Sequence, residues 1–174
     1  MITSRKFLAA LAVAGVALPL AIGAASSAQA SPLPSKTTSM LQHMVAEEKL
    51  AHDVYTTLGS QYRAPVFSRI AVSESRHQAS MRSLLAAYGV SDPTAGDAVG
   101  TFDDPDLQAL YDRLTAQGSR SFADAVAAGL LIERIDISDL DKAIAADPPA
   151  GITTVLERLR SGSQNHLAAF SRFT

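Results

Sequence analysis

The sequence contains no cysteine, so zinc-finger, iron–sulfur and thiol chemistry are excluded and no disulfide can hold the fold. It has no excess of basic residues either, because 15 Lys and Arg face 17 Asp and Glu. That balance disfavours nucleic acid as a partner. No serine has the His and Asp companions of a nucleophile, and no glycine-rich loop has the pattern that binds phosphate. No convincing strand pattern is present, so the domain is predicted to be all-α.

Residues 1–30 have the layout of a cleavable signal peptide. Two basic residues precede an apolar run over 7–25, and Ala28-Gln29-Ala30 forms an A-x-A cleavage site. The missing cysteine excludes a lipoprotein anchor, and no arginine pair marks twin-arginine export. We expect a secreted or cell-envelope protein with no permanent membrane span after cleavage. A retained membrane anchor is the competing interpretation.

The rest of the chain is predicted to be a flexible leader over 31–39 and a single helical domain over 40–174. Apolar residues recur with the helical period in four long segments and one short one. We expect helices over about 39–58, 65–88, 105–116, 121–146 and 152–173. Gly59-Ser60 and Gly89 are interpreted as stop signals of the first two, and Asp104 as the cap of the short helix.

The linkers within the first and the second pair of long helices are short, whereas residues 90–120 make a long crossover that carries the short helix. Two antiparallel pairs joined by one crossover make the arrangement of a ferritin-like four-helix bundle. The predicted fold is therefore a ferritin-like bundle with a short extra helix.

Polar residues interrupt the apolar side of each long helix near its middle. Glu74 and His77 stand where the repeat of 65–88 calls for apolar residues. Burying such groups without partners costs several kcal/mol. A metal ion would compensate, because side chains at i and i+3 can reach one cation. The complete set of candidate ligands is Glu48, Glu74, His77, Glu133, Asp136 and His166.

Two divalent cations would neutralise the four carboxylates of this set. Mixed oxygen and nitrogen ligation suits iron or manganese and does not exclude zinc. The Tyr55 hydroxyl is predicted to donate a hydrogen bond to a ligand carboxylate. The alternative hypothesis is that Tyr55 is redox-active. Glu47 is expected to face solvent or to support a ligand, and His43 and His52 are expected to be exposed. Asp136 has an alternative as the partner of Arg69 or Arg134.

The pattern resembles the ferritin-like di-metal carboxylate superfamily, which includes rubrerythrin. Glu48, Ala51 and Tyr55 match its spacing of ligand Glu, small residue and Tyr, and Glu74-x-x-His77 matches its metal motif. The chain resembles the DUF2202 family more closely, over nearly all of 40–173. The matching stretches are Glu47–Ala51, Asp53–Tyr55, Phe67, Ile70–Ala71, Glu74–His77, Ile132–Glu133, Asp136–Ile137, Asp139–Leu140, Gly162–Ser163, Asn165–Leu167 and Ala169–Phe170. The resemblance implies the bundle and a metal site, but no reaction.

One position departs from the ferritin-like pattern. Those proteins usually repeat Glu-x-x-His on a second helix, but Ser163 stands three residues before His166. Asp136 would supply the missing carboxylate from the neighbouring helix, and the site would then hold two ions. Without it, the site would hold one ion, or two unequally.

Three hypotheses for function follow. The first is a redox enzyme whose di-iron or di-manganese centre reacts with oxygen or peroxide or oxidises ferrous iron. The second is a metal-binding or metal-stabilised module without turnover. The third is a plain helical bundle whose acidic and histidine residues pair with one another. The expected partners are metal ions and small oxidants. The sequence does not indicate an oligomeric state.

Overall fold

The computed structural model describes residues 32–174, so the predicted signal peptide lies outside the described residues. Every regular element in this range is helical, which confirms the all-α prediction. The elements are α1 (Ser35–Tyr62), α2 (Pro65–Ala87), α3 (Pro105–Gly118), α4 (Phe122–Ala145), α5 (Ala150–Phe170) and the short 3-10 helix η1 (Ser171–Phe173). Within residues 32–174, no helix combines the length and the apolar character that a membrane span requires.

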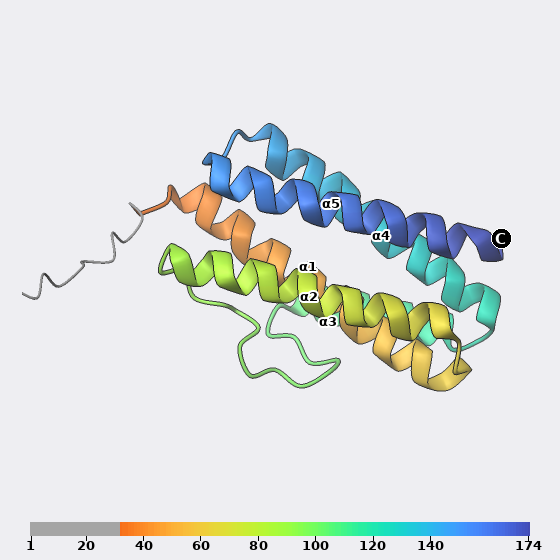
Figure 1. Ribbon diagram of the computed structural model, residues 1–174. Coiled ribbons are helices and arrows are strands. Elements are labelled where there is room, and N and C mark those ends of the chain that lie inside the picture. The colour runs from red at the N-terminus through yellow and green to blue at the C-terminus, as the bar shows by residue number, and fades with distance from the viewer. Residues whose placement is uncertain (1–31) are drawn as a thin grey trace, which may run out of the picture.

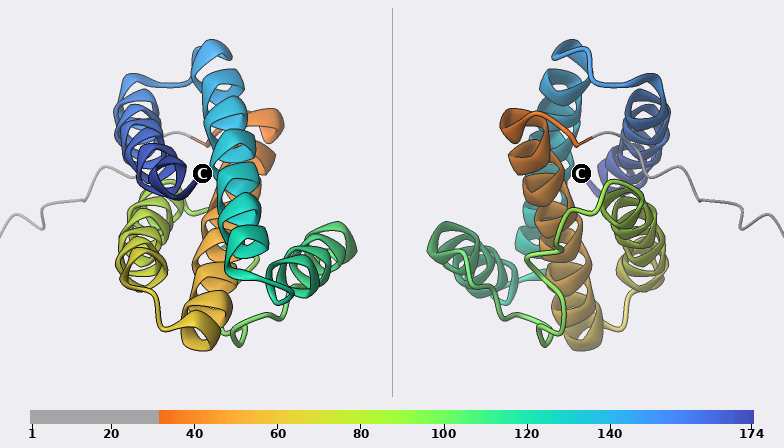
Figure 2. Two further views of the ribbon diagram at one scale, coloured as in Figure 1. Left: turned by 90° about the vertical axis from the view of Figure 1, so that its right-hand side faces the viewer. Right: turned by 90° about the vertical axis from the view of Figure 1, so that its left-hand side faces the viewer.

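The four long helices form a bundle of two antiparallel pairs (Figure 1). Two residues connect α1 to α2, and a short segment connects α4 to α5. Across the pairs, α1 packs against α4 and α2 packs against α5. The short helix α3 lies outside the bundle against α1 and α4, as Figure 2 shows. The predicted helical bundle with an extra helix in the crossover is therefore present.

Helix α1 is longer at its start than predicted, and this shortens the expected leader. It begins at Ser35, so residues 35–39 are helical. The Pro34 carbonyl accepts a hydrogen bond from the Thr38 N–H at 3.0 Å. Leu33 and Met40 pack against the apolar core, which holds this first turn on the bundle. Apolar anchoring outweighs the Pro/Ser/Thr-rich composition of the segment.

Helix α1 is also longer at its end, because the predicted stop at Gly59-Ser60 is wrong. The helix continues to Tyr62, whose hydroxyl donates to the Gly118 carbonyl at 2.7 Å. Gly59 instead allows α1 and α2 to pack closely. A Cβ at this position would lie 3.0 Å from the Phe67 Cβ of α2. The predicted cap of α3 is confirmed, since the Asp104 side chain accepts from the first N–H groups of that helix.

The apolar core is divided into two clusters. One lies toward the α1–α2 connection and includes Tyr55, Phe67 and Phe170. The other lies toward the α4–α5 connection and includes Leu41, Met81 and Leu156. Each long helix passes from one cluster to the other. The candidate ligands of the four helices occupy the level between the clusters, so the fold brings them to one layer.

The long crossover is attached to α1 by a buried ion pair. The Lys49 ammonium contacts the Asp53 carboxylate at 2.5 Å and donates to the Ala98 and Thr101 carbonyls of the crossover. It also lies 4.1 Å from the centre of the Phe102 ring, a cation–π contact. Asp53 additionally accepts from the Gly100 N–H. The pair therefore fixes the crossover across the outer face of α1.

Candidate metal centre

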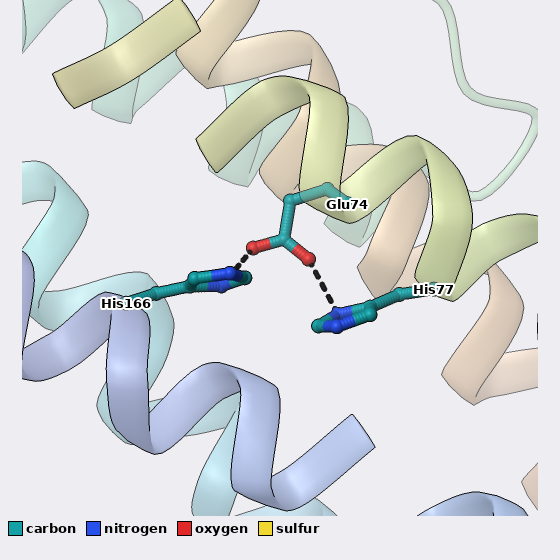
Figure 3. A group of neighbouring side chains, drawn as sticks. All are labelled: Glu74, His77 and His166. Atoms are coloured by element: carbon teal, nitrogen blue, oxygen red, sulfur yellow. Dashed lines mark ion pairs between the residues drawn. The ribbon is translucent and has the colours of Figure 1, made fainter. Parts of the chain in front are cut away.

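The polar layer inside the bundle is centred on Glu74. One oxygen of this carboxylate lies 2.8 Å from Nδ1 of His77, and the other lies 2.7 Å from Nδ1 of His166 (Figure 3). His77 is one turn away on α2, whereas His166 comes from α5. The two imidazole rings stack with their centres 5.3 Å apart. Glu74 thus lies between two histidines that face it from opposite pairs of the bundle.

Two further carboxylates complete the layer, one beside each histidine. Glu48 of α1 approaches His77 Nδ1 at 3.3 Å, and Glu133 of α4 approaches His166 Nδ1 at 3.6 Å. The arrangement has two similar halves, each with one histidine, one carboxylate of its own and one oxygen of Glu74. Glu48, Glu74 and Glu133 are each at most 2% exposed. Three predicted carboxylates and both predicted histidines therefore come together.

The donor atoms converge without satisfying one another. Although the nitrogen–oxygen distances are short, neither Nδ1 of His77 nor Nδ1 of His166 makes a hydrogen bond of acceptable direction within the described part of the chain. Glu48 Oε1 is also buried there without a hydrogen-bond partner. One atom each of Glu74, His77 and His166 lies within 4.8 Å of the other two. Such a set of oxygen and nitrogen donors fits a divalent cation such as iron or manganese.

The charges of Glu74, His77 and His166 stabilise one another's ionised forms. Burial opposes protonation of His77, but the Glu48 and Glu74 carboxylates outweigh it and raise its pKa to about 10. Burial likewise opposes protonation of His166, while Glu133 and Glu74 raise its pKa to about 9. Burial disfavours ionised Glu74, but the two imidazoles lower its pKa to about 2. Protons on the two histidines therefore balance part of the carboxylate charge of the layer.

The other carboxylates hold their protons more tightly than usual. Burial, with the Glu74 charge, raises the pKa of Glu133 to about 7. Burial raises the pKa of Asp136 to about 8 despite a compensating interaction with the Ser163 hydroxyl. Burial also raises the pKa of Glu48 well above its ordinary value. A divalent cation would displace these protons, since metal ligands bind in their deprotonated form.

Tyr55 supports the layer from the side of α1. Its hydroxyl donates to Glu133 Oε1 at 2.6 Å, which is the kind of contact that the sequence predicted for one of the carboxylates. The ring is fully buried against Phe67 and Phe170. Burial and the neighbouring carboxylates raise the pKa of Tyr55 well above its ordinary value, so the group stays a neutral donor. The oxygen of Glu133 that faces His166 is thereby fixed in direction.

Asp136 and Glu47 lie at the edge of the layer. Asp136 is buried, and among the described residues neither Arg69 nor Arg134 forms an ion pair with it. Its ligand role stays a prediction, because it is not one of the three residues that converge at the centre. The solvent-facing alternative for Glu47 is wrong, since the residue is buried and lines a small cavity with residues of α3 and α4. His43 is exposed as expected, whereas His52 is half-buried and contacts Asp53.

Gly162 is a site residue that sequence reasoning missed. A Cβ at this position would overlap Nε2 and Cε1 of the His77 ring. The absence of a side chain on α5 is therefore what admits the imidazole of α2. The available signal was a glycine one turn before His166 in an uninterrupted helix, where glycine costs roughly 1 kcal/mol relative to alanine.

Comparison with known proteins places the chain among relatives of the same architecture. The family described as an uncharacterized protein domain, DUF2202, matches residues 37–174. The uncharacterized protein MJ0754 of Methanocaldococcus jannaschii is 39% identical over 147 residues, which cover 84% of this chain and 80% of that protein. The crystal structure of the hypothetical protein MJ0754 from Methanococcus jannaschii superimposes with a TM-score of 0.81 at 38% identity and covers 85% of each chain. The chain belongs to the DUF2202 family.

Proposed function

We propose that this protein is an exported, ferritin-like di-metal carboxylate protein with redox chemistry toward oxygen, peroxide or ferrous iron. The position of Glu74 is the observation that carries the proposal. Its two oxygens face two histidines from different helices at 2.8 and 2.7 Å. A carboxylate placed in this way is suited to bridge two ions. The paired antiparallel helices with one crossover support the ferritin-like assignment.

The charge of the layer supports a pair of divalent ions. Glu48, Glu74, Glu133 and Asp136 carry four negative charges when all are ionised, and all four are buried. Removing only one partner of a buried charged set leaves an uncompensated charge that costs several kcal/mol. Two divalent cations would balance the four carboxylates and leave both histidines neutral, as ligation requires. Iron and manganese are the proposed cofactors, and zinc would fit the same donors.

The surroundings of the layer favour small reactants. The apolar clusters close it on both sides along the bundle, and its carboxylates are at most 8% exposed. When bound, a pair of iron or manganese ions would supply one-electron redox chemistry toward small oxidants. Tyr55 would hold Glu133 in place, and the His77 and His166 nitrogens would release their protons before binding. Metal ions, oxygen and peroxide are therefore the proposed partners.

The proposed location rests on the sequence. Residues 1–30 have the signal-peptide pattern, and the acidic composition argues against nucleic acid. We therefore place the protein outside the cytoplasm, secreted or held at the cell envelope.

The experiment that tests this function begins with metal-free protein loaded anaerobically with ferrous iron. We expect about two tightly bound ions per chain and, after oxygen or hydrogen peroxide is added, a change in the optical and EPR spectra. Tight binding of two ions without any spectral change would favour the non-catalytic metal-binding alternative. Absence of stoichiometric iron, manganese or zinc would overturn both and leave a plain helical bundle.

Substituting Gly162 with alanine tests whether space for His77 is needed for metal binding. A helical Gly→Ala change normally stabilises by roughly 0.5–1 kcal/mol. Here the added methyl group would displace the His77 ring. We therefore expect bound metal to fall by about one ion per chain in elemental analysis, while circular dichroism retains the full helix content.

Gly151→Ala is the matched control on the same helix, since a Cβ there meets no atom of the described residues within 4 Å. This variant should keep wild-type metal content. Unchanged metal content in Gly162→Ala would show that the His77 position does not govern binding.

A further inference from the structure

A second group of metal-capable side chains lies at the edge between α1 and α4. One atom each of His43, Glu47 and Asp139 lies within 4.8 Å of the other two. His43 Nε2 contacts Glu47 Oε1 at 3.3 Å across one turn of α1, and Asp139 comes from α4. The side chains of Glu47 and Glu48 point about 100° apart around α1. Glu47 therefore belongs to this outer group, whereas Glu48 belongs to the central layer.

Glu47 has a buried oxygen without a hydrogen bond. The residue is only 8% exposed, and its Oε2 has no hydrogen-bond partner among residues 32–174, whereas His43 contacts Oε1. A buried, unpartnered carboxylate oxygen costs free energy that a bound cation would recover. An ordinary surface cluster of acids would leave its oxygens in water, so the burial of Glu47 distinguishes this group.

Two pockets adjoin the group. One, of about 320 Å³ between α1 and the crossover, is lined by His43 and by three aspartates within 97–104. The other, of about 420 Å³ between α1 and α4, is lined by His43 and Asp139 together with Lys36 and Lys142. The carboxylates of the first pocket attract cations to His43, whereas two ammonium groups stand on the side of Asp139.

A lysine at present balances part of this charge. The Lys142 ammonium lies 2.5 Å from Asp139 Oδ1, and its side chain is 72% exposed. Exposed ion pairs of this kind contribute little stability and exchange readily. A divalent cation bound at Asp139 would compete with this ammonium, which predicts that removing Lys142 tightens binding.

Glu47 also links the group to the interior. Glu47 and Asp136 line one small cavity beneath Leu110 of α3. Asp136 is buried and lies one turn after Glu133 on α4, so both side chains are on the same side of that helix. Glu47 and Asp136 therefore lie between the exposed His43 and the central layer.

We propose that His43, Glu47 and Asp139 form a second, outer divalent-cation site, weaker than the buried centre. A further role in passing ions inward through Glu47 and Asp136 rests on the proposed function, whereas the outer site does not. Its ligands are one imidazole and two carboxylates, which suit Mn²⁺ or Fe²⁺. The half-exposed position leaves room for water in the remaining coordination positions.

The test is a titration of metal-free protein with Mn²⁺, followed by the loss of the EPR signal of free Mn²⁺. The Glu74→Ala variant, in which the central site is disrupted, should still bind one Mn²⁺ weakly. Adding His43→Ala and Asp139→Asn to it should weaken that binding at least tenfold. Lys142→Gln should tighten it by about tenfold, the effect of removing a unit charge a few ångström from a divalent ion in water. Glu157→Gln, an exposed acid on α5, should change nothing.

The outcomes separate the two proposals. Tight ions in the wild type with no weak ion sensitive to His43 would overturn the outer site alone. A weak, His43-dependent ion without tight ions would leave the outer site standing and contradict the buried centre. Because Lys142→Gln changes one exposed side chain of the wild type, it tests the outer site even if Glu74→Ala does not fold. An unchanged weak affinity in that variant would contradict the proposal.

In the wild-type background, stopped-flow loading tests the inward path. His43→Ala with Asp139→Asn should slow filling of the tight sites several-fold without changing their final number. An unchanged filling rate would contradict the path.

Discussion

Substituting Glu74 with alanine is expected to remove both tightly bound ions, although it changes only one residue. Each oxygen of Glu74 faces one histidine, so both halves of the layer lose a ligand together. Glu48→Ala and Glu133→Ala should each remove about one ion, because each carboxylate lies beside only one histidine. Elemental analysis of the three purified variants measures this difference.

The same substitution should abolish the response to a chelator. A ligand at roughly a thousand times its dissociation constant stabilises the folded state by about 4 kcal/mol. For a domain of this size, that corresponds to about 10 °C in melting temperature. We expect chelation to lower the melting temperature of the wild type by at least this amount and to leave Glu74→Ala unchanged. Glu157→Gln is the control for loss of a carboxylate and should behave as the wild type.

Two results would contradict this prediction. If Glu74→Ala retained the wild-type metal content, the central layer would not be the binding site. If Glu74→Ala and Glu48→Ala each removed the same single ion, Glu74 would not be shared between two ions. Helix content from circular dichroism must match the wild type for either result to count.

Substituting Asp53 with alanine is expected to destabilise the metal-free protein by about 3–5 kcal/mol, the typical cost of breaking a buried pair. Asp53 is 2% exposed and Lys49 is 4% exposed, so the ammonium would stay buried without its counter-ion. The Gly100 N–H would lose its acceptor as well. Urea denaturation gives the free energy of unfolding. Faster hydrogen exchange in the crossover would show where the effect lies.

Asp141→Ala is the matched control, since both side chains of its ion pair with Arg160 are about half exposed to solvent. It should change stability by less than about 1 kcal/mol. A similar small effect for Asp53→Ala would show that the crossover is held by other contacts.

The Asp53 contribution should also depend on pH. Burial opposes ionisation, but hydrogen bonds from His52, Lys49 and Gly100 outweigh it and lower the pKa of Asp53. A lowered folded pKa gives stability that is complete above the unfolded value of about 3.9 and is lost as the pH falls through the folded value. Acid unfolding of Asp53→Ala should therefore lack this part of the pH dependence.

The sequence predicted α2 closely because its signals are local. Pro65 at the first turn, an apolar repeat and Gly89 with positive φ after the helix define its bounds without help from the rest of the chain. The same reasoning was wrong for α1. Its first turn is held by apolar packing, and its last turn is held by Tyr62 bonding to α3. Both contacts are between segments far apart in the sequence, so composition alone does not report them.

Buried charges on α1 were the least predictable feature. Lys49 and Asp53, four residues apart, look like an ordinary surface ion pair on a helix. They are buried because the crossover folds over them. The burial of Glu47 arises in the same way, because residues of α3 and α4 lie around it. A helical repeat shows which apolar face is buried, but it does not show which polar face another segment covers.

The sequence by itself determined that the chain forms four long helices with polar residues interrupting their apolar faces. That follows from local periodicity, and it identified Glu48, Glu74, His77, Glu133 and His166 before any geometry was known. Only the tertiary structure decided that Glu74 lies between the two histidines and that Gly162 admits the His77 ring. Those relations depend on how far each helix is shifted and rotated against its neighbours, and the packing of both apolar clusters together fixes these quantities.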